Sequence, residues 1–276
     1  MSGAEGPDRP PRRVAIAGFG AIGYAVAAAI DRGIPGYRLA AVAARDLGAA
    51  APRMGVFVHP APTVPIEGLE PLADLVIECA PAAQMRAVVE PFVRAGKTAI
   101  LLSAGALLSH FDLVDIARLH GGQIVIPTGA LIGLDAVTAA AEGQIRTVRM
   151  ITRKPVRGLL GAPYLVEHRI DIAGIAEPLK VFDGTARAAA VGFPANLNVA
   201  VALSLAGIGP DRTMLEIWAD PALERNVHRI EVEADSARFS MTIENIPSEN
   251  PRTGRITPLS VIAWLRKQTA ALRVGT

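Results

Sequence analysis

The chain has 276 residues, a length that fits one large domain or two modest ones. Hydrophobic residues make up 51% of it and charged residues 20%, so the chain can bury a sizeable core and is not disordered by composition. There are 28 Lys and Arg against 26 Asp and Glu, without a long run of either sign, and only 4% of residues are aromatic. A nucleic-acid partner is therefore not expected.

A single cysteine, Cys79, cannot form an intrachain disulfide or a zinc site with other thiolates. It fits a reducing compartment, so we expect a cytoplasmic protein without a metal site. Residues 1–12 lack the apolar segment of a signal peptide, and we expect a disordered tail. The uncharged stretch 191–210 is long enough to cross a membrane, but its proline, asparagine and serine residues favour a buried helix start in a soluble protein.

From residue 13 onward, short apolar runs alternate with amphipathic segments of helix length, as in parallel strands joined by crossover helices. Strands are predicted at residues 14–17, 39–43, 75–79, 99–102 and 124–126, and helices at residues 21–32, 82–95 and 110–120. Gly33, Gly96 and Gly121 follow these helices, where a left-handed C-cap is expected. Because the strands are apolar throughout, the sequence predicts an α/β domain at 13–129 with a doubly wound parallel sheet covered on both faces.

After about residue 129 the pattern changes. Segments 145–152, 215–219, 229–234 and 238–244 alternate or carry β-branched residues between charges, which is typical of antiparallel strands with one solvated face. We therefore predict a second, mostly antiparallel α+β domain at 130–255, for substrate binding and dimerisation. A closing helix at 257–272, within the segment 256–276, is expected to pack back on the first domain.

A GxGxxG pattern directly follows the first predicted strand and opens the first helix. Gly18 would permit the tight turn, Gly20 the close approach of a pyrophosphate, and Gly23 close packing of helix on strand, with the positive end of the helix dipole facing the ligand. A tight turn that binds nothing is the alternative. The position at the start of a strand–helix series favours a dinucleotide, with Ala21 and Ile22 included in its site.

The end of the second strand indicates which dinucleotide is used. An acidic residue about 20 residues past the loop favours NAD, whereas an arginine accommodates the 2′-phosphate of NADP. Here Arg45 precedes Asp46, so NAD or NADP stays open, with Arg45 favouring tolerance of NADP. A solvated loop cation is the alternative interpretation of Arg45.

Small or rigid residues follow the later strands of the predicted sheet, at the edge where ligands of such sheets bind. Ala80, Ser103 and Ala104 would leave room for a flat nicotinamide ring and offer it backbone groups. Cys79 lies at the same edge, but no histidine is predicted beside it, and a buried structural cysteine is favoured over a nucleophile.

Five histidines are candidates for proton transfer. His59 lies in a proline-rich loop, His110 and His120 bracket a predicted helix, and His168 follows an acidic residue, so all four are expected at the surface. His228 differs because it opens a strand at the edge of a domain. A catalytic role and a structural role with satisfied hydrogen bonds both stay open for it on spacing alone.

The chain resembles the L-aspartate dehydrogenases of the type that feeds quinolinate and NAD synthesis. The resemblance spans nearly all of residues 13–266 and rests on the glycine loop together with segments 103–106, 127–130, 133–136, 152–155, 193–200, 220–221, 225–228, 243–245 and 250–251. The asparagine-rich segment 193–200 and the Asn-Val-His run at 226–228 are much more specific than the glycine loop.

This resemblance implies an N-terminal Rossmann domain, a C-terminal α/β domain that supports a homodimer, and NAD or NADP as the oxidant of L-aspartate. The product would be iminoaspartate, a quinolinate precursor that water also converts to oxaloacetate and ammonia. His228 would be the catalytic residue, with Ala130 and Asn196 at the nicotinamide end of the cofactor. Hydride removal from Cα needs a neutral amine, and a histidine with a pKa near 6.5 can take the ammonium proton.

Charge alone suggests residues that hold the two carboxylates of such a substrate. We predict Arg153 and Lys154 for this role, since a guanidinium fork suits a carboxylate, and Asn198 as a further substrate contact. Solvated cations at a strand end are the alternative for Arg153 and Lys154.

Two other functions compete with this interpretation. Another two-domain Rossmann reductase is the nearest, but the sugar-type enzymes carry a Lys-Pro pair where this chain has residues 103–106, and Lys154-Pro155 comes much later. A non-catalytic dinucleotide sensor would bind the cofactor without turnover. The presence of both His228 and Asn196 favours an enzyme.

Overall fold

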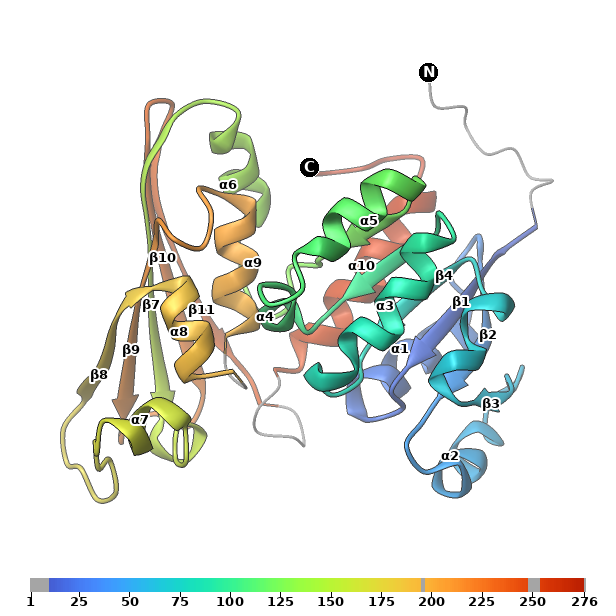
Figure 1. Ribbon diagram of the computed structural model, residues 1–276, viewed down its shortest axis with the longest axis horizontal. Helices are drawn as coiled ribbons and strands as arrows, with labels where there is room; N and C mark the ends of the chain where they lie inside the picture. Colours follow the sequence, from blue (N-terminus) through green and yellow to red (C-terminus); the bar gives the residue numbers. More distant parts are fainter. Residues whose placement is uncertain (1–9, 195–196, 248–253, 276) are drawn as a thin grey trace. The chain divides into compact units, whose positions relative to one another are not determined.

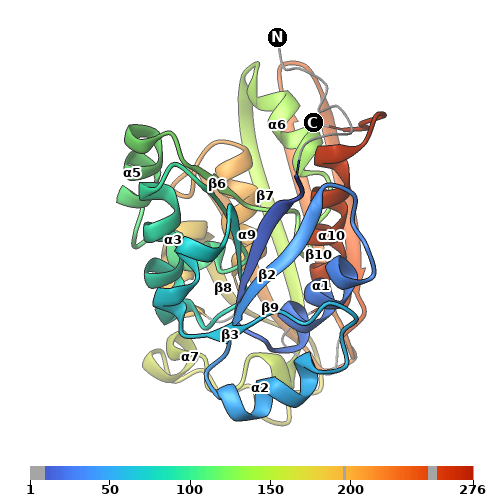
Figure 2. The same ribbon diagram turned by 90° about the vertical axis from the view of Figure 1, so that its right-hand side faces the viewer.

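A computed structural model describes residues 10–194, 197–247 and 254–275 (Figures 1 and 2). The chain divides into two compact units: the first runs to Pro127 and includes Pro258–Val274, and the second comprises Thr128–Thr257. None of the helices in the described ranges is both long and apolar enough for a membrane span.

The first unit contains a six-stranded sheet with the order β3-β2-β1-β4-β5-β6, in which every pairing is parallel. Its strands are β1 (Arg12–Ala17), β2 (Tyr37–Ala43), β3 (Thr63–Val64), β4 (Leu75–Glu78), β5 (Thr98–Leu101) and β6 (Gln123–Val125). Its α-helices are α1 (Ala21–Asp31), α2 (Leu47–Met54), α3 (Met85–Arg94), α4 (Ala104–Leu107), α5 (Asp112–His120) and α10 (Ile256–Thr269), with short 3-10 turns η1 (Ile66–Gly68), η2 (Glu70–Leu72) and η3 (Ala82–Gln84). This strand order is that of the Rossmann fold, so the predicted doubly wound sheet is confirmed.

Helices cover both faces of this sheet, with α1 and α10 on one side and α3 and α5 on the other (Figure 2). The central strand β1 is buried from Val14 to Ala17, and Val14 and Ile16 share a hydrophobic cluster with residues of α1. Val261 and Leu265 of α10 belong to the same cluster. The last helix therefore completes the core of the first unit, although more than a hundred residues of the second unit separate the two in sequence.

The glycines predicted to end helices in the first unit do follow helices in the structure. Gly33, Gly96 and Gly121 follow α1, α3 and α5, and their φ angles are +106°, +70° and +72°. Arg12 lies in β1, one residue earlier than the predicted start of the domain, because its backbone N–H donates to the carbonyl of Gly36. The short elements α2, β3 and α4 were not predicted.

The second unit contains a five-stranded sheet with the order β11-β10-β7-β9-β8. Its elements are α6 (Leu134–Ala141), β7 (Ile145–Pro155), η4 (Val156–Gly158), α7 (Pro163–Glu167), β8 (Leu179–Thr185), α8 (Ala186–Gly192), α9 (Asn198–Ala206), β9 (Thr213–Asp220), β10 (Asn226–Ala234) and β11 (Arg238–Asn245). Only the pairing of β7 with β9 is parallel, so the prediction of a mostly antiparallel sheet is confirmed.

One face of this second sheet is covered by α6, α8 and α9 (Figure 1). Side chains alternate across each strand, so Val148 and Met150 of β7 are buried toward these helices whereas Arg149 points to the other face. The same alternation continues to the carboxyl end of β7, where the polar residues of the site lie.

Candidate functional site

The glycine loop between β1 and α1 is shaped by two glycines that tolerate no side chain. Gly18 has a φ of +100°, and a Cβ there would lie 2.5 Å from the carbonyl oxygen of Cys79. A Cβ on Gly23 would lie 1.9 Å from the carbonyl oxygen of Gly18. Both glycines are therefore required by the fold itself, for the turn and for the packing of α1 on β1.

Gly20 differs from the other two, because a Cβ built on it meets nothing within 4 Å. It stands at the N-cap of α1, directly before exposed Ala21, while Ile22 packs against the hydrophobic cluster of the first unit. Open space beside the backbone at a helix N-terminus is what a pyrophosphate group needs for close approach. The residues of this loop thus fit a dinucleotide.

The same change, glycine to alanine, is expected to have opposite effects at Gly20 and at Gly23. Gly20→Ala is expected to leave the thermal unfolding midpoint within about 2 °C and to weaken dinucleotide binding about tenfold, because the new methyl group fills the space beside the backbone. Gly23→Ala is expected to destabilise the protein by about 1–3 kcal/mol or more, because its methyl group overlaps a backbone carbonyl. Calorimetry of unfolding and of cofactor binding checks both, and a stable Gly23→Ala protein would contradict the packing argument.

A buried carboxyl group organises the carboxyl edge of the first sheet. Glu78, the last residue of β4, is fully buried, and its Oε2 accepts hydrogen bonds from the backbone N–H groups of Leu102 (3.2 Å) and Ser103 (2.9 Å). Its Oε1 accepts a hydrogen bond from Oγ of Ser103 at 3.1 Å. Burial raises the pKa of Glu78 to about 7, and these hydrogen bonds oppose that rise.

This carboxyl group brings three predicted cofactor contacts to one edge of the sheet. Ala80 lies two residues after Glu78, Ser103 is bound by it, and Ala104 begins α4. Sequence reasoning missed Glu78, although a single charged residue at the end of an apolar strand was a usable signal. Burial and the neighbouring Glu78 raise the pKa of the Cys79 thiol, which agrees with a structural cysteine and not with a thiolate nucleophile.

The predicted catalytic histidine is buried in the second unit. His228 lies on β10 opposite Thr152 of β7, and its side chain is on the buried face of the strand, with 3% of the residue exposed. Nδ1 of His228 lies 3.2 Å from Oγ1 of Thr152. None of the other four histidines is buried.

Lys154 lies two residues after Thr152 on β7, so both side chains point to the same face of the sheet. Lys154 is 4% exposed, and burial lowers its pKa to about 8. Burial, followed by the charge of Lys154, lowers the pKa of His228 to about 3. The imidazole of His228 is therefore neutral at physiological pH. The buried amine of Lys154 beside it has a pKa only slightly above physiological pH.

Arg153 does not belong to this cluster. It lies between Thr152 and Lys154 on β7 and therefore points to the opposite face, where its Nη2 forms an ion pair with Oδ2 of Asp220 at 2.9 Å. Its guanidinium also lies 5.8 Å from the ring centroid of Trp218. The structure therefore does not bring Arg153 and Lys154 together, because adjacent residues of a strand point to opposite faces of the sheet, and a role of Arg153 in substrate binding stays a prediction.

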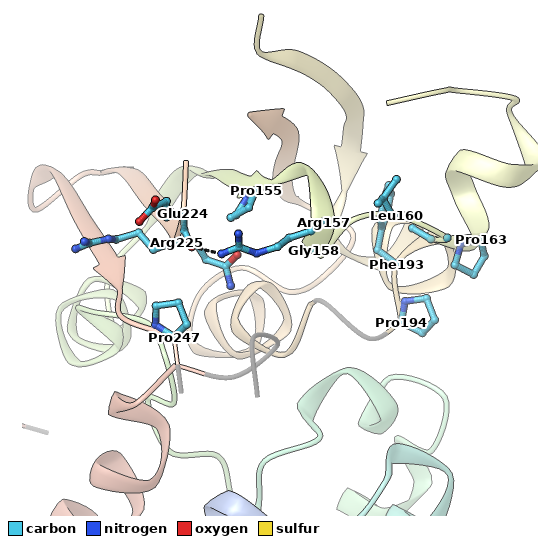
Figure 3. Close-up of a pocket in the computed structure, with 13 residues that line it drawn as sticks. Pro155, Arg157, Gly158, Leu160, Pro163, Phe193, Pro194, Glu224, Arg225 and Pro247 are labelled. Atoms are coloured by element: carbon cyan, nitrogen blue, oxygen red, sulfur yellow. Dashed lines mark hydrogen bonds between the residues drawn. The ribbon is translucent and has the colours of Figure 1, made fainter. Parts of the chain in front are cut away.

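A cavity of about 310 Å³ opens where β7 ends and β10 begins (Figure 3). It is lined by Pro155, Arg157, Gly158, Leu160, Gly161, Ala162, Pro163, Phe193, Pro194, Glu224, Arg225, Asn226 and Pro247. Arg157 extends toward Glu224, to whose backbone oxygen it donates a hydrogen bond at 3.0 Å, and Arg225 lies 3.8 Å from the carboxylate of Glu244. The sequence did not identify Arg157 and Arg225 as residues of this cavity, although Arg157 follows the predicted substrate residue Lys154 by only three positions.

The remaining predicted residues occupy different places. Asn198 is the exposed first residue of α9. The carbonyl oxygen of Ala130 accepts a hydrogen bond from Nδ2 of Asn245 at 2.9 Å, which ties the start of the second unit to the end of β11. Arg45 is exposed after β2. Asn196 lies outside the described residues.

Comparison with known proteins adds independent information. Residues 18–127 match the family model described as homoserine dehydrogenase, NAD binding domain, and residues 135–268 match aspartate dehydrogenase, C-terminal. The chain is 63% identical to an L-aspartate dehydrogenase of Bradyrhizobium diazoefficiens over 96% of its own length and 94% of the relative, and 58% identical to L-aspartate dehydrogenase 3 of Bordetella bronchiseptica over 95% and 97%.

A solved structure has the same fold over almost the whole chain. The aspartate dehydrogenase of Thermotoga maritima superposes with a TM-score of 0.74 at 22% sequence identity, covering 96% of this chain and 99% of that one. The relatives with 63% and 58% sequence identity, which are matched nearly end to end, show the family of the chain. The chain belongs to the aspartate dehydrogenase family.

Proposed function

We propose that the chain is an NAD- or NADP-dependent dehydrogenase that oxidises the CH–NH₂ group of L-aspartate. The product is iminoaspartate, which water converts to oxaloacetate and ammonia. One observation carries this proposal: a buried histidine with a buried lysine beside it, in a chain 63% identical to an L-aspartate dehydrogenase. These two residues supply what the reaction asks of a protein, a proton acceptor and a positive charge for a carboxylate.

His228 accepts the proton that the substrate ammonium must lose. We infer that its Nδ1–H donates to Oγ1 of Thr152, because this tautomer leaves the lone pair of Nε2 for the substrate. Without substrate, burial and the charge of Lys154 keep the imidazole a weak base. The carboxylates of a bound dicarboxylate offset that charge, so binding raises the pKa of His228 and turns it into an effective base.

Lys154 and the arginine-lined cavity share the binding of the two carboxylates. Lys154 presents its charge on the same face as His228, and Arg157 and Arg225 border the cavity that begins at the next residue, Pro155. A dinucleotide whose pyrophosphate is bound at the glycine loop would accept the hydride from Cα of the substrate on its nicotinamide ring.

We also propose a homodimer and a cytoplasmic location. The sheet face opposite α6, α8 and α9 supports the dimer, because within the described part of the second unit no helix covers it. Ile151 and Trp218 are half-buried there, and Met214 is 41% exposed. A second copy of the chain would cover these apolar groups.

The direct test mixes purified protein with NAD or NADP and L-aspartate and follows the absorbance of the reduced nicotinamide. We expect reduction with L-aspartate and none with D-aspartate, L-malate or myo-inositol. Reduction with malate or inositol would identify a different dehydrogenase. Cofactor binding without turnover of any substrate would identify a dinucleotide sensor instead.

A further inference from the structure

The end of β2 is held against the glycine loop. The backbone N–H of Gly18 donates to the carbonyl oxygen of Ala43, the last residue of β2, at 2.8 Å. Residues immediately after Ala43 therefore lie next to the loop that fits a pyrophosphate. In Rossmann domains this is where the adenosine ribose is bound, and where its 2′ substituent is read.

The acidic residue at this place is used by the fold. Asp46 is the only acidic residue between positions 43 and 57. It is the N-cap of α2, and its Oδ1 accepts a hydrogen bond from the backbone N–H of Ala49 at 3.0 Å. A carboxylate that binds NAD at this position accepts hydrogen bonds from the ribose hydroxyls instead. The geometry of Asp46 thus favours the start of α2 over a ribose.

Arg45 comes before Asp46 in the chain and is exposed. Among the residues that the structure describes, no carboxylate forms an ion pair with it. A guanidinium group so placed is available to a phosphate, which it binds with paired N–H donors.

A second guanidinium reaches the same loop from α2. Nη1 of Arg53 donates to the backbone oxygen of Phe19 at 2.6 Å, and the guanidinium carbon lies 5.0 Å from the ring centroid of Phe19 and 4.7 Å from that of Tyr24. Phe57 packs on both rings, with centroids 6.2 and 5.5 Å away. Arg53 is therefore held in place by stacking, while most of its five N–H donors are not used by that single bond.

We propose that the chain prefers NADP to NAD, and that Arg45 and Arg53 bind the 2′-phosphate on the adenosine ribose. The inference rests on the dinucleotide role of the glycine loop in the proposed function and names the form of the cofactor. Near the end of β2 there are two cations, Arg45 and Arg53, and one carboxylate, Asp46, which caps α2. This surplus of positive charge suits a phosphate and not a ribose hydroxyl.

The test uses fragments of the two cofactors, so that it does not depend on turnover. Isothermal titration of the full chain with adenosine 2′,5′-bisphosphate and with adenosine 5′-monophosphate gives a ratio of dissociation constants. We expect about 100-fold tighter binding of the bisphosphate by the wild type, and a ratio lowered about tenfold in Arg45→Ala and in Arg53→Ala. Affinity for the monophosphate should stay unchanged in Arg45→Ala, which shows that the loop is intact.

Arg38→Ala is the matched control, because Arg38 is an exposed arginine near the other end of the same strand β2. It removes the same charge and should leave the ratio unchanged. Equal affinity of the wild type for both fragments would overturn the proposal, as would an Arg38→Ala effect as large as that of Arg45→Ala. If the fragments bind equally well, the preference for NADP is wrong but the proposed oxidation of L-aspartate still stands. If the protein binds the bisphosphate more tightly but does not oxidise L-aspartate, only the proposed function is contradicted.

Discussion

Replacing His228 by asparagine is expected to lower kcat for L-aspartate oxidation by about 10² to 10⁴, the usual contribution of a positioned acid or base. The asparagine keeps a polar group at the buried position but cannot take a proton from the substrate ammonium. Because His228 is proposed to exchange a proton with the substrate and not to bind the cofactor, the dissociation constant of the cofactor should stay within about twofold. Steady-state kinetics and calorimetric titration of the cofactor measure the two quantities.

His168→Asn is the matched control for this substitution. His168 lies in the same unit but is exposed, with its ring stacked on Tyr164 at a centroid distance of 3.9 Å. The same chemical change there should leave kcat within about twofold. A His228→Asn enzyme that retains activity within a few-fold of the wild type would remove His228 from proton transfer.

The buried imidazole also has a consequence for stability at low pH. Its pKa is about 3 in the folded chain and about 6.5 when unfolded, so the unfolded state binds more protons between these values. This residue therefore lowers the free energy of unfolding as pH falls from 6.5 toward 3, by up to about 5 kcal/mol. His228→Asn should show a shallower loss of stability over this window, a readout that is independent of catalysis.

The sequence predicts the first unit well because its signals are local. Continuous apolar strands, a glycine loop between the first strand and helix, and glycines with positive φ after α1, α3 and α5 are each decided by neighbouring residues. The second unit was predicted less completely. Its strand β8 contains Lys180, Asp183 and Gly184, and its helices α6 to α9 are 5 to 9 residues long, too short for a clear period.

The site shows the limit of reasoning from residue type. Arg153 and Lys154 are adjacent cations, but their roles depend on which face of β7 each one occupies, and this is fixed only by pairing with β9 and β10. Glu78 forms a hydrogen bond with Leu102, 24 positions away, and Thr152 lies within hydrogen-bonding distance of His228, 76 positions away. Such contacts arise from tertiary packing, so a single sequence identifies the candidates without showing which of them meet.

Replacing Lys154 by methionine is expected to raise KM for L-aspartate about 100-fold, because a buried positive charge that binds a carboxylate is lost while the volume of the side chain is nearly kept. Lys180→Met is the control, since Lys180 lies in the same sheet but is 39% exposed and forms an ion pair with Asp183 at 2.6 Å. It should leave KM within about twofold. Kinetics with saturating cofactor separates the two variants.

The same substitution should also remove a pH dependence of stability that the buried amine causes. Burial lowers the pKa of Lys154 to about 8 from an ordinary value near 10.5, so the unfolded state binds more protons between these values. The free energy of unfolding of the wild type should therefore rise by up to about 3 kcal/mol as pH increases from 8 to 10.5, and Lys154→Met should lack this rise. Denaturant unfolding across this range measures both. A Lys154→Met protein whose stability rises over this range as much as that of the wild type would show that the rise does not come from Lys154.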